Sequence, residues 1–352
     1  MTTDLDALEA GVADLLSDLC TPERLAAVEG DLDRQLWEAL ESAELTRVGV
    51  PEEAGGSGGS LAESAVVLRL AGERAASLPL AETSMIVGPV LAAAGLAVPD
   101  GPLTVGLGEV TAQRSAEGWR VRGLLRRVPY GGLADTVAGM ATTADGRLIF
   151  RVPTSATKVV AGRNVAGEPR DDIAVDIDLP PTSVAAVPED AEREIRLRGA
   201  LSRAVLVAGA AQAALDLSVR YAQERMQFGR PIAAFQAVQQ HIAGLAAEAA
   251  AARAAADAAV RVCGHGFGSA AAGLAVAAAK ARTAQAAGTV AAIAHQVHGA
   301  IGMTQEHPLR FTTTRLWAWR SEWGGERQWT QHIANVAVSL DDQDLWPMLV
   351  GM

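Results

Sequence analysis

Residues 209–232 read GAAQAALDLSVRYAQERMQFGRPI, and this stretch decides what kind of fold to expect. Small and apolar residues follow one another at the spacing of a long helix, and Gly229 then favours the end of that helix. Arg225 lies at this end, so its guanidinium can project beyond the helix. Phe228 follows and offers the face of an aromatic ring.

The chain around this stretch is also helical. Apolar periodicity predicts helices over 192–225, 235–262 and 269–300 and from about 325 onward. Gly264–Gly268 interrupts the pattern between two of them. We therefore expect residues 190–352 to form a four-helix bundle, in which the many alanines allow close packing.

The spacing of apolar residues changes from helical to strand-like upstream of this bundle. Short β-branched or alternating runs between 103 and 187 are separated by Gly, Asp and Pro, which predicts a small β-barrel or sheet domain over 99–189. Asp145-Gly146 predicts a tight hairpin within it. Residues 1–98 are predicted to form a helical domain, interrupted by a glycine-rich loop at 48–59 and resumed near Ser60. The predicted fold class is α+β.

Composition narrows the classes of function. The formal net charge of −11 argues against a nucleic-acid-binding surface, and 49% hydrophobic residues can form a sizeable core. Charged residues interrupt the alanine-rich stretch 243–290, so we expect no membrane span. The acidic N-terminus lacks the features of a secretory signal, so a cytoplasmic location is expected. Cys20 and Cys263 show neither zinc-site nor disulfide spacing, and no metal site is expected.

Two blocks carry a resemblance to a known family. The stretch at 209–232, continued by FQAVQ at 235–239, and the stretch QVHGAIGMTQEHP at 296–308 resemble the hallmarks of acyl-CoA dehydrogenases. The helix-strand-helix order extends this resemblance over nearly the whole chain. It implies the acyl-CoA dehydrogenase fold, FAD as cofactor and an acyl-CoA as substrate.

The resemblance also implies which residues contact the cofactor. In relatives, the matching arginine and its neighbours contact an FAD held mainly by a neighbouring subunit, and other contacts come from the following helix and the glycine-rich block. In this chain these positions are Arg225, Gln227, Phe228, Gln236, Gln296, Gly299 and Ala300. An isolated arginine at a helix end could simply complement the helix dipole, but the two blocks together favour the cofactor contact.

The catalytic base of the family is harder to place. Relatives carry a glutamate in a Tyr-Glu-Gly-Thr segment, which falls here on residues 322–325 and puts Trp323 at the position of the base. Glu322 lies one residue early, which would rotate its side chain by roughly 100 degrees on a helix. Other relatives carry the base on the first helix of the bundle, but residues 199–208 contain no carboxylate, and Glu192 and Glu194 lie too far upstream. Glu322 remains the candidate base.

The predicted β domain departs from the family in a second way. The loop that resembles Thr-Glu-Pro-x-Ala-Gly-Ser-Asp in relatives, and that hydrogen-bonds the flavin, has no counterpart between residues 105 and 123. Arg193, Arg196, Arg198 and Arg203 form a basic cluster, which we interpret as a solvated helix start rather than a CoA site.

These departures lead to three hypotheses. The chain resembles the shortened partner subunit of bacterial α2β2 acyl-CoA dehydrogenases, which would act on a bulky acyl-CoA such as a sterol side-chain thioester. Alternatively, it is a self-sufficient homo-oligomer that uses Glu322 as its base. A third hypothesis is a helical assembly protein that binds no flavin. Under the first two, a hetero- or homo-oligomer arranged as a dimer of dimers is expected.

Overall fold

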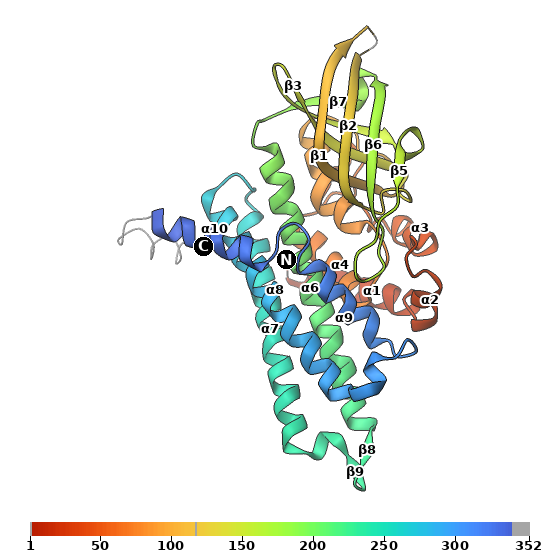
Figure 1. The fold of residues 1–352 in the computed structure, drawn as a ribbon, viewed down its shortest axis with the longest axis vertical. Coiled ribbons are helices and arrows are strands. Elements are labelled where there is room, and N and C mark those ends of the chain that lie inside the picture. The colour runs from red at the N-terminus through yellow and green to blue at the C-terminus, as the bar shows by residue number, and fades with distance from the viewer. Residues whose placement is uncertain (1, 117, 340–352) are drawn as a thin grey trace. The chain divides into compact units, whose positions relative to one another are not determined.

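A computed structural model describes residues 2–116 and 118–339, and its elements follow the predicted order of helices, strands and helices (Figure 1). The last residues of the predicted C-terminal domain, 340–352, lie outside the described residues. The chain forms two compact units. The helical unit comprises Met1–Pro22, Ala65–Ala76 and Ala200–Met352, and the sheet unit comprises Glu23–Ser64 and Ser77–Gly199. The two units do not correspond one to one to the predicted domains 1–98, 99–189 and 190–352, because each unit includes part of residues 1–98. The three domain ranges therefore stay a prediction.

The sheet unit contains a seven-stranded sheet. Its strands are β1 (Leu103–Ser115), β2 (Gly118–Pro129), β3 (Thr136–Thr143), β4 (Gly146–Pro153), β5 (Lys158–Val160), β6 (Arg170–Leu179) and β7 (Val184–Val187). The strand order is β5-β6-β2-β1-β3-β4-β7. Strands β1 and β3 pair in parallel, and every other neighbouring pair is antiparallel.

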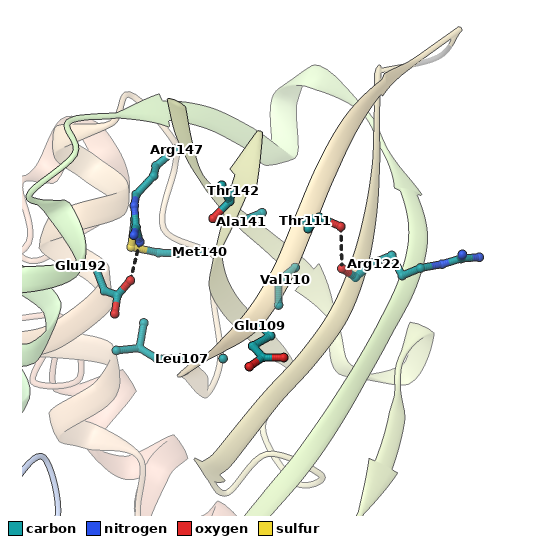
Figure 2. A pocket seen from close by; sticks show the side chains of 11 residues that line it. Leu107, Glu109, Val110, Thr111, Arg122, Met140, Ala141, Thr142, Arg147 and Glu192 are labelled. Atoms are coloured by element: carbon teal, nitrogen blue, oxygen red, sulfur yellow. Dashed lines mark hydrogen bonds and ion pairs between the residues drawn. The ribbon is translucent and has the colours of Figure 1, made fainter. Parts of the chain in front are cut away.

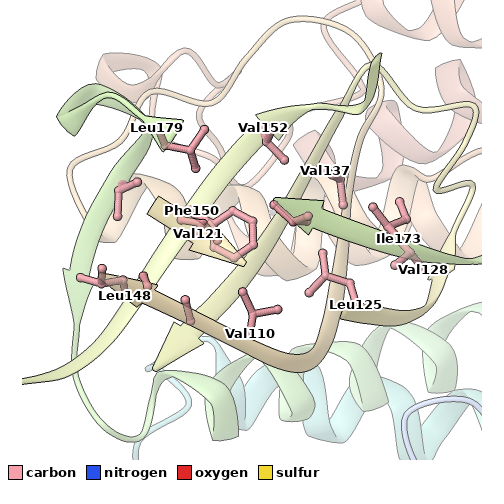
Figure 3. Close-up of a cluster of buried hydrophobic side chains, with 14 residues drawn as sticks. Val110, Val121, Leu125, Val128, Val137, Leu148, Phe150, Val152, Ile173 and Leu179 are labelled. Atoms are coloured by element: carbon pink, nitrogen blue, oxygen red, sulfur yellow. The ribbon is translucent and has the colours of Figure 1, made fainter. Parts of the chain in front are cut away.

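The core of this sheet comes from alternate residues that share one face. Val121 and Leu125 on β2 meet Phe150 on β4 and Ile173 on β6, and none of these four side chains is exposed (Figure 3). The predicted hairpin is confirmed, but its two turn residues are Ala144 and Asp145, because Thr143 pairs with Gly146, the first residue of β4. Strands β1 and β2 are longer than the sequence predicts, and the short strands β5 and β7 were not predicted.

Helices of the N-terminal segment support the sheet. They are α2 (Pro22–Ala27), α3 (Arg34–Ser42), a π-helical turn (Ala81–Val87) and α5 (Gly88–Ala93). Thr83 in the π-helical turn donates a hydrogen bond from Oγ1 to the carbonyl oxygen of Leu103 (2.8 Å), and its Oγ1 accepts one from the Leu103 amide (3.3 Å). This hydroxyl therefore anchors the first residue of β1.

The helical unit contains the helices of the predicted bundle. Its elements are α1 (Thr2–Leu19), α4 (Leu61–Glu73, which begins in the sheet unit), α6 (Ala191–Glu224, likewise), α7 (Gln236–Cys263), α8 (Ala270–His298), α9 (Leu309–Trp319) and α10 (Glu326–Ser339). Four of them, α6, α7, α8 and α10, correspond to the predicted segments. Helix α9 was not predicted, because its run of threonines and aromatic residues has low helix propensity.

Glycines let α4 and α6 touch through their backbones. A Cβ on Gly209, the first residue of the stretch 209–232, would lie 2.0 Å from the carbonyl oxygen of Arg69. A Cβ on Gly72 would lie 2.6 Å from that of Leu206. Helix α1 is tied to α4 by an ion pair between Glu9 and the buried Arg69 (2.8 Å). The small residues of the motif thus determine how closely these helices pack.

Helix α6 is long and apolar enough to cross a membrane by length and composition alone. However, 78% of its apolar window is buried inside the protein. The core helix of a folded domain meets the same criterion, so this feature is weak evidence for a span.

Candidate functional site

The end of α6 is the first part of the candidate site. The helix stops at Glu224, and the next residue, Arg225, bonds its amide to the carbonyl of Tyr221 (2.9 Å). A two-stranded hairpin follows, formed by β8 (Met226–Gln227) and β9 (Arg230–Pro231) (Figure 1). The amide of Ile232 closes it on the carbonyl of Arg225 (2.8 Å). Arg225 is therefore placed at the junction of helix and hairpin, as predicted.

The turn of this hairpin presents Phe228 to the outside. Phe228 has φ +52 and Gly229 has φ +77, as a two-residue hairpin turn with both central residues in the left-handed region requires. A phenylalanine is unfavourable in this conformation, and its side chain is nevertheless 91% exposed. An exposed aromatic ring held in a strained turn is typical of a contact site.

Charged and aromatic side chains surround this ring. Phe228 meets Phe235 edge-on with ring centroids 6.1 Å apart, and the Arg230 guanidinium lies 4.2 Å from the Phe235 ring. Gln227 on β8 and Gln236 at the start of α7 are both exposed. In the described part of the chain, the guanidinium of Arg225 has no ion-pair partner, so its charge is available to an external anion.

The end of α8 carries the second group of predicted contact residues. Gln296, Gly299 and Ala300 are all exposed there. Gly299 has φ +63, a conformation that favours glycine, and no atom within 4 Å would block a side chain. Gly302 differs, because it is buried and its Cβ would lie 2.8 Å from the Cβ of His298. The first glycine therefore serves the backbone turn, and the second permits close packing.

Glu322, the predicted base, lies in a buried cluster of charges. Its Oε2 accepts a hydrogen bond from Nε of Arg203 (2.7 Å), and the two side chains are 10% and 2% exposed. Lys280 on α8 belongs to the same cluster and is 1% exposed. Its Nζ donates to the carbonyl oxygens of Trp319 (3.2 Å) and Arg320 (2.7 Å), at the end of α9.

The electrostatics of this cluster are dominated by burial. Desolvation lowers the pKa of Lys280 to about 7, and the positive charges of Arg203 and Arg320 act in the same direction. The negative charge of Glu322 acts against them but does not outweigh them. Glu322 is thus the ion-pair partner of the buried Arg203, and its negative charge also acts on the buried Lys280.

The residues after Glu322 form a tight turn. Trp323 has φ +56 and Gly324 has φ +101. A Cβ on Gly324 would lie 2.5 Å from Nε1 of Trp329, whose indole donates to the carbonyl oxygen of Trp323 (3.1 Å). The side chain of Trp323, which the resemblance to the family places at the position of the base, cannot accept a proton.

The predicted basic cluster is divided in the structure. Arg196 and Arg198 pair with Glu192 (2.8 Å) and Glu194 (2.7 Å) one turn earlier on α6. Arg203 is 2% exposed, so the interpretation of all four arginines as a solvated helix start was wrong for this residue. A second buried cation, Lys280, could have been found from the sequence. It follows Val276 by one helical turn and therefore lies on the same buried face of α8.

The sheet unit contains a cavity of about 490 Å³, shown in Figure 2. It lies where β1 shifts register against β3 between Gly106 and Thr111. Arg147 pairs with Glu192 at its rim. Burial works to raise the pKa of Glu192, but hydrogen bonds from Arg196 and Arg147 outweigh it and lower the pKa. This carboxylate is therefore ionised and paired.

Strand β1 also bears on the predicted absence of a flavin-binding loop. It pairs with β2 from Leu107 opposite Arg126 to Ser115 opposite Gly118. The segment that would have to carry the loop is thus occupied by a continuous strand. Within residues 2–116 and 118–339, no group of three or more His, Cys, Asp or Glu side chains could hold a metal ion.

The order of elements and the two predicted contact segments, at Arg225–Phe228 and at Gln296–Ala300, define a class of protein, the acyl-CoA dehydrogenases. Residues 197–327 match the description "Acyl-CoA dehydrogenase, C-terminal domain", and residues 2–97 match "Acyl-CoA dehydrogenase, N-terminal domain". The chain belongs to this family of oxidoreductases.

Particular relatives make the comparison more specific. The chain is 30% identical over 315 residues to the acyl-CoA dehydrogenase IpdE2 of Mycolicibacterium smegmatis, covering 88% of this chain and 91% of the relative. It is 32% identical over 317 residues to IpdE2 of Mycobacterium tuberculosis, covering 86% and 87%. The structure is similar to a chain of the ChsE4-ChsE5 complex from Mycobacterium tuberculosis, with TM-score 0.87, 25% identity and coverage of 96% and 98%. A variant of the Tcur3481-Tcur3483 steroid ACAD matches with TM-score 0.81, 25% identity and the same coverage.

Proposed function

We propose that this chain is the partner subunit of an FAD-dependent acyl-CoA dehydrogenase, in which a second subunit supplies the catalytic base. The observation that carries the proposal is the ion pair between Glu322 and Arg203. Freeing this carboxylate to accept a proton would break its ion pair with the buried guanidinium of Arg203, and breaking a buried pair costs about 3–5 kcal/mol. Glu322 therefore acts as a structural residue.

The two contact segments support FAD as the cofactor. The guanidinium of Arg225, which has no ion-pair partner among residues 2–116 and 118–339, suits a phosphate, and the uncovered ring of Phe228 suits a flat aromatic group. When bound, FAD would accept the hydride from the β-carbon of the thioester. The residues of this chain would bind the cofactor and cover it from one side. Since β1 leaves no loop to complete the site, a second subunit would provide the remaining contacts.

Similarity to two-component assemblies supports a heteromer. The ChsE4-ChsE5 complex and the Tcur3481-Tcur3483 steroid ACAD are each named for two components. We infer that this chain assembles with another acyl-CoA dehydrogenase subunit, in a dimer of dimers that acts on a bulky acyl-CoA of the sterol side-chain type. The cytoplasmic location stays a prediction.

The spectrum of purified protein tests the proposal. The chain is expressed alone and together with the product of a neighbouring dehydrogenase gene, and flavin absorbance and acyl-CoA oxidation are recorded for both. We expect flavin and activity only in the complex. Flavin and activity in the lone chain would instead support the self-sufficient enzyme. Colourless protein in both preparations would support the helical assembly protein.

The role of Glu322 needs its own variants, because Glu322→Gln breaks the buried ion pair with Arg203. The double variant Arg203→Met with Glu322→Gln removes both charges and so avoids this penalty. If Glu322 is structural, the double variant should retain most of the activity of the complex. Complete loss of activity in a folded double variant would identify Glu322 as the base.

The role of Arg225 in binding can be measured directly. Arg225→Ala should weaken FAD retention by about 1.5–3 kcal/mol, the value of a charge-assisted hydrogen bond. Arg220→Ala is the matched control, since Arg220 is exposed on the same helix. Equal affinities of both variants and the wild type would show that the arginine does not contact the cofactor.

A further inference from the structure

Three aromatic rings join the ends of α6 and α8. Tyr221 stacks on His298 with ring centroids 4.6 Å apart and an angle of 21° between the rings. His307 meets His298 edge-on at 4.8 Å and 70°, and it meets Tyr221 at 6.2 Å and 90°. We call Tyr221, His298 and His307 the ring cluster. None of the three is among the contact residues predicted from the sequence.

The ring cluster lies directly behind both contact segments. Tyr221 is one helical turn before Arg225 and accepts the hydrogen bond of its amide (2.9 Å). His298 is the last residue of α8, and Gly299 follows it with φ +63. Because the two rings stack, a displacement of one helix end would be passed to the backbone that leads into the other contact segment.

Packing around His298 restrains the ring on the remaining sides. His298 is 3% exposed, and its Nδ1 donates to the carbonyl oxygen of Ala294 (2.8 Å). Gly302 approaches so closely that a Cβ there would lie 2.8 Å from the Cβ of His298. His295, one turn earlier, bonds its Nε2 to Oγ1 of Thr313 on α9 (3.0 Å). The imidazole is thus held by α6, α8 and the segment before α9.

We propose that Tyr221 and His298 are positioning residues that hold the two flavin-contact segments, at Arg225–Phe228 and at Gln296–Ala300, in a defined arrangement. This inference rests on the proposed function as far as the flavin is concerned. The coupling between the two segments, however, is a property of the chain itself and can be measured without flavin.

The packing of the ring cluster requires the imidazoles of His298 and His307 to be uncharged. Burial lowers the pKa values of His295, His298 and His307 below the ordinary value of 6.5. His307 and His295 are the ionisable groups that act on His298, and a backbone contact to Leu217 partly opposes the shift. Glu306 lies next to His307, and hydrogen bonds to its own backbone and to the side chain of Thr304 lower the pKa of its carboxyl group, with a smaller contribution from the charge of Arg310.

The sign of the pH effect follows from these lowered pKa values. The unfolded chain takes up protons on these histidines near pH 6.5, whereas the folded chain resists protonation until the pH is lower. The contribution of the ring cluster is therefore complete above pH 6.5 and is lost as the pH falls through the folded pKa values. The contact segment at the end of α8 should loosen in the same range.

Hydrogen exchange of the full chain tests the coupling. In Tyr221→Ala, the amides of residues 299–304 should exchange about tenfold faster, although the substitution lies on another helix. Tyr221→Phe keeps the ring and should restore slow exchange, and Arg220→Ala is the control for a surface change on α6. Faster exchange confined to α6 in Tyr221→Ala would overturn the proposal.

The pH profile separates positioning from simple packing. In the wild type, exchange of residues 299–304, corrected for its intrinsic pH dependence, should accelerate as the pH falls below 6.5. His298→Phe keeps an aromatic ring without a titrating group and should reduce this acceleration. An unchanged profile in His298→Phe would argue against the role of His298.

FAD affinity connects the coupling to function. In a preparation that retains FAD, Tyr221→Ala should weaken binding about tenfold, and Tyr221→Phe should recover it. If the wild type binds no FAD in any preparation, the proposed function fails while the exchange experiment still decides on the coupling. If the wild type binds FAD and Tyr221→Ala changes neither exchange nor affinity, the positioning role is refuted and the proposed function stands.

Discussion

Replacing Lys280 with methionine should reduce the pH dependence of the stability of this protein. Lys280 is 1% exposed, and burial lowers its pKa from 10.5 to about 7. The unfolded chain therefore keeps this proton up to about pH 10.5, whereas the folded chain releases it near pH 7. Because the unfolded state binds more protons between these values, the free energy of unfolding should rise with pH in this range. The penalty for burying the charge is fully present below pH 7.

The size of this effect follows from the shift. A depression from 10.5 to about 7 corresponds to a penalty of about 5 kcal/mol at low pH. Between pH 7 and pH 9, roughly 2 kcal/mol of that penalty should be relieved in the wild type. A methionine carries no proton, so this part of the rise should be missing from the variant. Methionine also leaves the carbonyls of Trp319 and Arg320 without their donor, which shifts the stability at every pH and cancels in the difference.

Urea unfolding at pH 7 and pH 9 measures the difference. The relevant quantity is the change in the free energy of unfolding between the two pH values, compared between wild type and Lys280→Met. Lys158→Met is the matched control, since Lys158 is exposed on β5 and its replacement should leave the pH dependence unchanged. A difference between wild type and Lys280→Met below about 0.5 kcal/mol would refute the assignment of a perturbed, buried lysine.

Three further substitutions test the packing around the site and the sheet. Gly302→Ala should lower the thermal midpoint, with a loss of about 1–3 kcal/mol, because its Cβ would lie 2.8 Å from that of His298. Glu168→Gln should cost about 3–5 kcal/mol in urea unfolding, since it breaks the buried ion pair with Arg170, whose atoms lie 2.9 Å apart. Thr83→Val removes the hydroxyl that bonds the backbone at the start of β1, and unfolding should show a loss of about 1–3 kcal/mol.

Controls for these variants come from exposed positions. Gly268→Ala should be tolerated, because no atom lies within 4 Å of a Cβ at this position. Glu189→Gln is the control for Glu168, since Glu189 is exposed. Stabilities of the three core variants that match these controls would contradict the packing and pairing described above.

The amino-acid sequence by itself determined the class of the protein and the local backbone around the predicted contact residues. Helix α6 ends at Glu224, just before Arg225, and the turn at Phe228 and Gly229 is a local consequence of a two-residue hairpin. The order of helices and strands likewise follows from local periodicity. Local signals could not reveal α9 or the short strands β5 and β7, because these elements depend on the neighbours against which they pack.

Only the tertiary structure decided which charged and aromatic side chains are buried and which partners they contact. Arg203 and Glu322 are 119 residues apart, and nothing in the spacing of the chain indicates that they form a buried pair. Tyr221 and His298 meet because α6 and α8 end at the same place. Spacing along a helix predicts which residues share a face, but burial and the identity of a partner arise only when helices pack. For this reason Glu322, which the sequence offers as a base, is the counter-charge of a buried arginine in the folded chain.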